Sequence, residues 1–251
     1  MKIDFCPPMA TPGELRRAES VLESLVPEEQ WAVYATVLRQ ALDLGLRFAV
    51  GGGLAYSLYS ECQRNTKDLD VFILPDDHQP FLDLMALNGF TEYTAVPYDP
   101  TWSYRGHRQD YILDVLWRML NNRAVFDDAW VSRGWQLNIR GVPVKLIPPE
   151  ELIWSKLYII YRERCDWPDI LSILHARGAQ LDWEHLLART GDDAPLLGSV
   201  LTLFRWLCPG RAATFPHWIW KRLGLSETAP VGPDVDRSRA DLIHGGSWFP
   251  Q

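Results

Sequence analysis

The sequence has few cysteines and no long apolar run. Its four cysteines lie far apart and show no paired spacing: Cys6, Cys62, Cys165 and Cys208. This pattern predicts neither a zinc site nor a disulfide framework. No apolar run reaches the roughly 18 residues of a membrane-spanning helix, and the first ten residues, MKIDFCPPMA, lack the apolar core of a signal peptide. We therefore expect a soluble cytoplasmic protein with reduced thiols and no membrane partner.

Positive charge is also scarce. The 251 residues include 25 Lys and Arg but 32 Asp and Glu, which gives a formal net charge of −7. Because surfaces that coat nucleic acid are usually basic, this charge argues against a broad surface of that kind and leaves room for a local basic groove. The hydrophobic content of 47% is that of an ordinary globular protein. The length allows one large domain or two small ones.

One stretch, residues 48–74, combines glycines and acids between two apolar segments. It reads FAVGGGLAYSLYSECQRNTKDLDVFIL. An apolar strand leads into three glycines at 51–53, a short helical segment follows, and a second apolar strand opens with Asp68 and Asp70. The predicted order is therefore strand, glycine turn, helix and strand, with two acids at the start of the second strand.

The spacing of the two acids indicates a cation site. Side chains alternate along a strand, so Asp68 and Asp70 point to one face while Leu69 and Val71 point to the other. Two neighbouring carboxylates repel each other, and an apolar strand is a costly place for unpaired charge. A hard divalent cation such as Mg²⁺ removes both costs, and it typically binds one or two carboxylates together with substrate phosphates.

The glycines supply the other half of such a site. Gly51, Gly52 and Gly53 have no Cβ, so their backbone can approach a ligand closely. A helix that begins just after them directs free N–H groups at an anion. Arg64 and Lys67 precede the acids and could add positive charge against a triphosphate. Together these residues predict a metal–nucleotide site.

A third acid interrupts an apolar strand further along the chain. Asp114 lies in the middle of the segment 111–117, which reads YILDVLW. A buried carboxylate needs a partner, and a metal shared with Asp68 and Asp70 is one. An ion pair or a cap at a strand edge is the other interpretation of Asp114.

The remaining pattern predicts an α+β fold: a mixed sheet of about five strands flanked by helices, with an all-helical C-terminal part. Helices are expected at 12–25, 27–44, 79–87, 125–133, 150–164, 183–189, 195–207, 216–223 and 237–243, and strands at 46–50, 68–74 and 111–117, with weaker strands within 91–106 and a hairpin over 135–147. The Pro-Pro-Glu-Glu run at 148–151 marks a boundary. We expect a core with N-terminal helices at 1–148 and a helical region with a tail at 149–251.

The glycine and acid motif also carries a resemblance. Gly52-Gly53, then fourteen residues, then Asp68-Leu69-Asp70 resembles the signature of the DNA polymerase β-like nucleotidyltransferase superfamily. The fuller string, GGGLA followed by RNTKDLDVF, resembles the small bacterial branch of AbiEii/MenT-type nucleotidyltransferases. The likeness covers roughly residues 46 to 170, and the motif lies between two predicted strands, as such motifs require. Gly-Gly replaces the Gly-Ser of many members and resembles the CCA-adding branch, which leaves the substrate open.

The resemblance implies a role for each motif residue. It implies two Mg²⁺ ions held by Asp68, Asp70 and Asp114, which are also catalytic, and a catalytic lysine at Lys156. Nucleotide contacts are implied for the residues of the glycine turn, the loop before the acids and the later helix: Gly51, Gly52, Gly53, Arg64, Thr66, Lys67 and Asp169.

Lys156 and the aspartates after it have a second interpretation. In the resembling branch, a lysine on the helix after the sheet and an aspartate beyond it belong to the active site. Lys156 matches the former, and Asp166 or Asp169 matches the latter. Lys156 could instead be a surface lysine whose stem covers apolar area. Asp166 and Asp169 likewise fit the N-cap and N3 positions of a helix with Pro168 at its start.

The function implied by the resemblance is transfer of a nucleoside monophosphate from a nucleoside triphosphate (NTP) to an acceptor hydroxyl. In the AbiEii/MenT-type branch the acceptor is RNA such as a tRNA 3′ end, and the enzyme is the toxin partner of an antitoxin. Related small nucleotidyltransferases modify proteins or antibiotics, acceptors that suit an acidic chain at least as well. From a different class, a non-catalytic module that binds nucleotide or a partner protein stays open.

Overall fold

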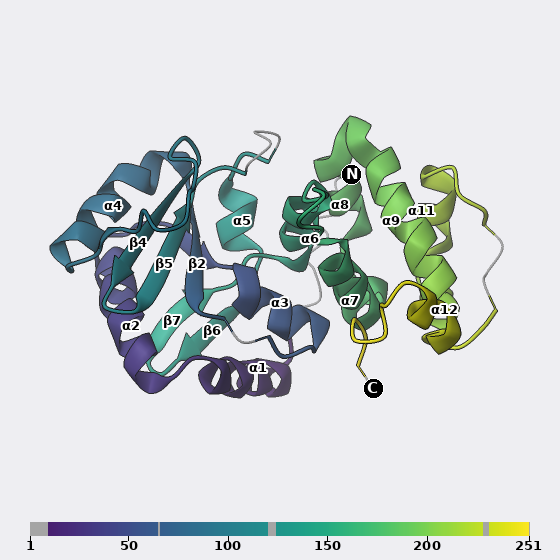
Figure 1. The fold of residues 1–251 in the computed structure, drawn as a ribbon, viewed down its shortest axis with the longest axis horizontal. Coiled ribbons are helices and arrows are strands. Elements are labelled where there is room, and N and C mark those ends of the chain that lie inside the picture. The colour runs from purple at the N-terminus through teal and green to yellow at the C-terminus, as the bar shows by residue number, and fades with distance from the viewer. Residues whose placement is uncertain (1–9, 65, 120–123, 228–230, 251) are drawn as a thin grey trace. The chain divides into compact units, whose positions relative to one another are not determined.

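The computed structural model describes residues 10–64, 66–119, 124–227 and 231–250, which form two compact units (Figure 1). One unit contains residues 10–58 and 63–148, and the other contains residues 59–62 and 149–250. The expected α+β class is confirmed, with a five-stranded mixed sheet and a largely helical C-terminal half. Within the described ranges, no helix is long and apolar enough to cross a bilayer.

The first unit is built on the five-stranded sheet. Its strands, in spatial order, are β1 (Phe48–Val50), β2 (Asp68–Ile73), β5 (Tyr111–Leu116), β4 (Ser103–Arg108) and β3 (Thr91–Glu92). The central pair β2 and β5 is parallel, and the other neighbours are antiparallel. The predicted hairpin is confirmed as a separate two-stranded sheet of β6 (Gln136–Ile139) and β7 (Val142–Lys145). Its turn residues Arg140 and Gly141 both have positive φ, as tight hairpin turns favour.

One face of the sheet is apolar and covered by helices. Helices α2 (Glu28–Asp43) and α4 (His78–Leu87) lie along it (Figure 1). Phe48 of β1 meets Phe81 of α4 with ring centroids 6.0 Å apart. Tyr34 of α2 contacts the ring of Tyr111 on β5. The residues that β2 and β5 direct to this face are largely fully buried: Leu69, Val71, Ile73, Leu113 and Val115.

Three further helices complete this unit: α1 (Pro12–Leu25), α3 (Gly52–Ser60) and α5 (Asp128–Ser132). The predicted capping box of α1 is confirmed, because the side chain of Thr11 accepts the N–H of Glu14 and the Glu14 carboxylate accepts the N–H of Thr11. Helix α5 is shorter than the predicted 125–133. Asp127 caps it by accepting the N–H of Ala129, which fixes its first turn at Asp128.

The second unit consists mainly of helices that pack on one another. These are α6 (Pro149–Leu157), α7 (Trp167–Arg177), α8 (Trp183–Thr190), α9 (Ala194–Leu207), α10 (Pro209–Ala212), α11 (His217–Arg222) and α12 (Arg237–Leu242). Short 3₁₀ turns occur in this unit at Gly178–Gln180 and Gly191–Asp193, and in the first unit at Pro75–Asp77. The C-terminal tail is docked: Phe249 is buried, and the carbonyl of Trp248 accepts the hydroxyl of Ser172 at 2.6 Å.

The helix predicted at 150–164 ends at Leu157 instead. The chain then reverses, with Ile160 and Cys165 forming an isolated antiparallel bridge. The N–H of Asp166 donates to the carbonyl of Ile159 at 2.8 Å. This reversal brings Asp166 back beside Lys156, with which it forms an ion pair. A continuous helix would prevent this pair, because residues ten positions apart lie about 15 Å apart along a helix.

Two adjacent glutamates at the start of α6 are buried. Glu150 accepts the N–H of Asp182 at 2.7 Å. Glu151 accepts Nε2 of His185 at 2.6 Å and Nε of Arg189 at 3.0 Å. Burial raises the pKa of the Glu150 carboxyl above its ordinary value of 4.5, and the hydrogen bond from Asp182 only partly opposes this.

We predict that Glu150→Gln changes how stability depends on pH. A carboxyl with a raised pKa in the folded state binds its proton more tightly there than in the unfolded chain, so the wild type loses stability as pH rises above 4.5. Relative to Glu150→Gln, the loss should reach at most about 1.4 kcal/mol per pH unit within the titration window. Denaturant unfolding at a series of pH values measures it. Glu184→Gln, an exposed position on α8, should show no such trend, and a wild type that gains stability over this window would contradict the prediction.

Candidate active site

The face of the sheet opposite the α2–α4 layer carries a row of charged side chains. Asp70 of β2 is directly in register with Asp114 of β5, and Asp114 is directly in register with Arg105 of β4. The row therefore runs Asp70, Asp114, Arg105 across three adjacent strands. Asp68 lies two residues before Asp70 on the same strand and shares its face. The structure thus brings the three predicted acids to one face of neighbouring strands.

Asp114 is held by an ion pair. Arg105 donates from Nε and from a terminal nitrogen to the two carboxylate oxygens of Asp114, at 2.7 and 2.5 Å. The Asp114 residue is only 8% exposed. Burial raises the pKa of the Asp114 carboxyl, and the hydrogen bonds and charge of Arg105 only partly oppose this. Of the two interpretations of Asp114 that the sequence left open, the ion pair is observed.

The glycine turn lies directly against Asp70. The N–H of Gly51 donates to the carbonyl of Asp70 at 2.9 Å. Gly52 has φ +54°, and a Cβ added to it would lie 1.6 Å from Oδ2 of Asp70. Only glycine fits here, because any side chain would occupy the space of the carboxylate and would also be strained. The glycine turn therefore sets the position of one acid.

Thr66 holds the other acid of the pair. Its Oγ1 lies 2.9 Å from Oδ1 of Asp68 and 2.9 Å from the Asp68 carbonyl. A Cβ added to Gly53 would lie 3.0 Å from the same Oγ1. Thr66, predicted as a nucleotide contact, thus lies between the start of α3 and Asp68, where it orients the Asp68 carboxylate.

The two cations before the acids are on the surface. The guanidinium of Arg64 lies over the ring of Tyr56, 5.8 Å from its centroid, and the Arg64 N–H donates to Ser57. Arg64 and Lys67 are both exposed. Their predicted contact with a triphosphate stays a prediction.

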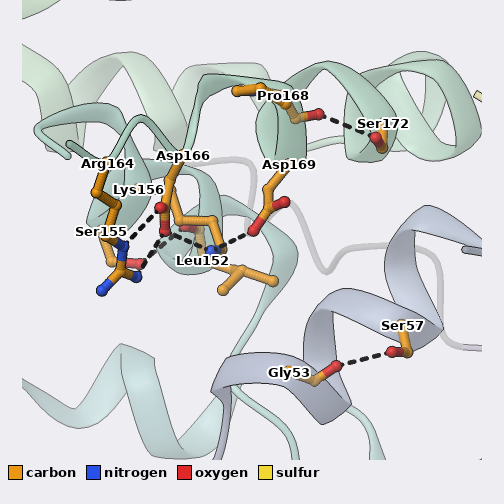
Figure 2. A network of polar contacts seen from close by, with 10 residues as sticks. All are labelled: Gly53, Ser57, Leu152, Ser155, Lys156, Arg164, Asp166, Pro168, Asp169 and Ser172. Carbon is orange, nitrogen blue, oxygen red and sulfur yellow. Dashed lines mark hydrogen bonds and ion pairs between the residues drawn. The ribbon is translucent and has the colours of Figure 1, made fainter. Parts of the chain in front are cut away.

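A second charged cluster lies in the helical unit (Figure 2). Nζ of Lys156, on α6, donates to Oδ2 of Asp166 at 2.8 Å and to Oδ2 of Asp169 at 2.7 Å. Arg164 donates to Asp166 from the other side at 2.9 and 3.0 Å. Lys156 is 8% exposed and Asp166 is 7% exposed. Lys156 is therefore a buried, paired lysine, which corrects the interpretation of it as a surface residue.

Asp166 takes the N-cap position of α7 without capping it through its side chain. The Asp166 carbonyl accepts the N–H groups of Asp169 and Ile170. Its carboxylate binds Lys156 and Arg164 instead. Burial would raise the pKa of Asp166, but the hydrogen bonds of Arg164 and the charge of Lys156 outweigh it and hold the pKa below the ordinary value of 3.8.

Arg105 is the polar residue that sequence reasoning missed. The sequence predicts the segment 103–108, SYRGHR, only as part of a weak strand region ending at 106. Arg105 and His107 alternate along β4 and share the face of Asp114. A cation directly opposite a lone acid on a neighbouring strand is a favourable cross-strand pair. The sequence shows the alternation of Arg105 and His107, but only the pairing of β4 with β5 shows that Arg105 lies opposite Asp114.

Several solved structures have a similar chain trace. The antibiotic-resistance factor ANT(2″)-Ia matches with a TM-score of 0.44 and 19% identity, over 68% of this chain and 95% of its own. The lincosamide antibiotic adenylyltransferase LnuA matches with a TM-score of 0.40 and 17% identity, over 59% and 96%. An antigenic nucleotidyltransferase-like protein from Paracoccidioides brasiliensis matches with 0.38 and 23%, over 71% and 94%.

Two of these proteins are named as an adenylyltransferase and a nucleotidyltransferase-like protein. At these identities and TM-scores the likeness assigns neither a family nor a substrate. No family model matches the sequence, and no curated protein matches it. The AbiEii/MenT-type branch stays a resemblance of the motif.

The donor set on the sheet face fits a divalent cation completed by a ligand. Asp68 and Asp70 offer two half-buried carboxylates on one face, and the absence of a side chain at Gly52 leaves room for one of them. Such a pair suits Mg²⁺, which keeps several waters or phosphate oxygens among its six ligands. Across the described part of the chain, no group of three His, Cys, Asp or Glu side chains could hold a metal by itself. Asp114, occupied by Arg105, does not complete one.

We predict that Gly52→Ala weakens cation binding beyond its effect on stability. A left-handed backbone costs an alanine about 1–2 kcal/mol, and at Gly52 the new Cβ would also displace the Asp70 carboxylate. The matched control is Gly141→Ala, which has φ +79° and nothing within 4 Å of the added Cβ. Both variants should lose similar backbone stability in thermal melts. Only Gly52→Ala should weaken Mn²⁺ binding in titrations, and equal Mn²⁺ affinity in both variants would contradict the role of Gly52.

We predict that Lys156→Met strongly destabilises the helical unit. The change leaves Asp169 without its Lys156 partner and removes one of two cations from Asp166. Removing one partner of a buried ion pair typically costs about 3–5 kcal/mol. Lys221→Met, an exposed position on α11, controls for the lost charge. Denaturant unfolding measures both, and a loss no larger than that of the control would show that the Lys156 pairs contribute little to stability.

Proposed function

We propose that this chain is a metal-dependent nucleotidyltransferase that transfers a nucleoside monophosphate from an NTP to an acceptor hydroxyl. The observation that supports it is the alignment of Asp70 with Asp114 on adjacent parallel strands, with Asp68 on the same face. Packing alone does not place three acids on one face of two central strands, because each adds repulsion and a desolvation cost. Functional sites are where such arrangements are concentrated.

Each residue of the site has a role in this proposal. Asp68 and Asp70 would hold Mg²⁺, which supplies charge against the triphosphate and orients it. Gly52 and Gly53 open α3, where free N–H groups favour a phosphate. Thr66 fixes the rotamer of Asp68 through its 2.9 Å contact.

The proposed reaction is a displacement at the α-phosphorus of the NTP. The acceptor oxygen forms a bond to the α-phosphorus while the bond from that phosphorus to its bridging oxygen breaks, and pyrophosphate leaves with the electron pair. The proton of the acceptor hydroxyl passes to the Asp114 carboxylate, the base that the resemblance implies. Lys156 and Asp169 stay predicted nucleotide contacts on that resemblance, and in the structure each is a partner of the other.

For the acceptor we propose RNA, such as a tRNA 3′ end, with the chain acting as a toxin that has an antitoxin partner. This choice rests on the motif string GGGLA with RNTKDLDVF. Protein and antibiotic acceptors are the alternatives. A small-molecule acceptor calls for a deep pocket beside the acids. A cavity of about 410 Å³ is lined by Phe48, at the start of β1, and by Lys145, at the end of β7. Gly51 follows the other end of β1, so this cavity lies away from the glycine turn.

The second candidate function is a nucleotide-binding or partner-binding module without catalysis. One observation favours it: Asp114 is paired with Arg105, and no three-ligand metal group is found in the part of the chain that is described. A binding module needs the glycine turn and the two acids of β2 but no free base. The two functions differ in whether the nucleoside monophosphate of the bound nucleotide is transferred to an acceptor.

We predict transfer of α-labelled nucleotide that depends on Asp68. The protein is incubated with each of the four NTPs and Mg²⁺, together with total RNA, total protein or a panel of aminoglycosides and lincosamides. Even loss of a group that only supports a metal ligand costs about 10–100-fold, so Asp68→Asn should reduce label by at least about 100-fold. Asp76→Asn, an exposed acid just after β2, should leave it unchanged.

The pool that takes the label names the acceptor class. Label that persists in Asp68→Asn would contradict the assigned site. If no pool is labelled and a fluorescent ATP analogue still binds in an Asp68-dependent manner, the binding module replaces the transferase.

A further inference from the structure

Arg105 pairs with the acid that a second metal ion would need. In the row Asp70, Asp114, Arg105, the middle carboxylate faces a neighbour of like charge on one side and a cation on the other. A metal ion near Asp70 and Asp114 would offset their repulsion. The guanidinium of Arg105, on β4, also offsets it and binds both oxygens of Asp114.

The geometry and burial of the Arg105–Asp114 ion pair favour a stable contact. Two parallel N–H···O bonds form a bidentate pair, the geometry in which guanidinium binds carboxylate best. The side chains are only 24% and 11% exposed, so water competes weakly for either partner. Arg105 also lies in the field of the other two acids, because Asp68 and Asp70 add to Asp114 in raising its pKa. The guanidinium therefore binds Asp114 directly and interacts with Asp68 and Asp70 only through their charge.

Charge balance leads to the same conclusion. The formal charges of these four side chains, three carboxylates and one guanidinium, sum to −2, which equals the charge of a single divalent ion with the opposite sign. A second ion on Asp114 would compete with the guanidinium for the two carboxylate oxygens and would place two further positive charges beside Arg105, which is unfavourable.

We infer that Arg105 replaces the second metal ion, so that the site takes one divalent cation, at Asp68 and Asp70, and Asp114 acts while bound to Arg105. The inference rests on the proposed function and narrows its metal requirement from the two ions that the motif implies to one. Arg105 is a positioning residue in this scheme: it holds the Asp114 carboxylate in place, and Asp114 receives the proton of the acceptor hydroxyl.

The test counts bound Mn²⁺ by the loss of its free electron paramagnetic resonance signal, without nucleotide and at about pH 8, where carboxylates are ionised. Wild type should bind one ion per chain. Asp68→Asn should lose it, and Asp114→Asn should keep it. Arg105→Met frees Asp114 and should bind a second ion, which Arg105→Met/Asp114→Asn should not.

Two further variants separate charge from structure. Arg105→Lys retains a cation and should bind one ion, as wild type does. Arg108→Met removes a cation from the same strand without a link to Asp114 through the register, and should also bind one. Thermal melts show whether each variant is folded. If Arg105→Met does not fold, the numbers of Mn²⁺ ions bound by wild type and by Asp114→Asn decide whether Asp114 binds a second ion.

Failure of this inference differs from failure of the proposed function. Two ions in wild type, one of them lost in Asp114→Asn, would overturn the role of Arg105 and leave the transferase intact. An unchanged single ion in a folded Arg105→Met would also overturn it. Ion binding that is absent in wild type, or that survives Asp68→Asn, would remove the metal site itself and both proposals with it.

Discussion

The repulsion between Asp70 and Asp114 is the constraint on which the site depends. Their strands are adjacent, parallel and in register, so the two carboxylates face each other across one strand spacing of about 4.8 Å. They cannot slide apart, because a shift of one residue would turn Leu69 and Leu113 from the α2–α4 layer to the other face. The core therefore fixes the acids, and compensation must come from neighbouring cations, the guanidinium of Arg105 among them.

In the helical unit, two neighbouring acids, Asp166 and Asp169, are both paired with cations of the chain itself. Lys156 lies between Asp166 and Asp169, and Arg164 covers the outer side of Asp166, so the charges are paired within a few residues of the α6–α7 connection. The result is a cluster whose acids are stabilised in their ionised form. On the sheet, by contrast, Asp68 has a hydroxyl and Asp114 a single cation. The sheet face is the one where we propose that a metal ion binds.

Local patterns predicted most elements and few of the contacts. The capping box at Thr11, the alternation of β2 and the hairpin at Arg140 are short-range signals, and all three were correct. The end of α6 at Leu157 was missed because the chain reverses after it, and the contacts of that reversal join residues seven and ten positions apart, Ile159 with Asp166 and Lys156 with Asp166. The Arg105 pair was missed for a similar reason, since it depends on which strand lies beside β5. Sequence spacing predicted the acids, and the strand order was needed to find the partner of one of them.

The order of strands also explains how a motif can imply two metal ions where we propose one. The motif contains Asp68 and Asp70, and the position of Asp114 follows from its strand, but neither includes the residue opposite Asp114. In this chain that residue is a cation with an ideal bidentate geometry, so the third acid is neutralised before any ion arrives. A neutral residue at position 105 would leave the same three acids with a charge of −3, which only further cations or protonation of a carboxyl could offset. The metal requirement therefore depends on β4 as much as on the strands that carry the acids.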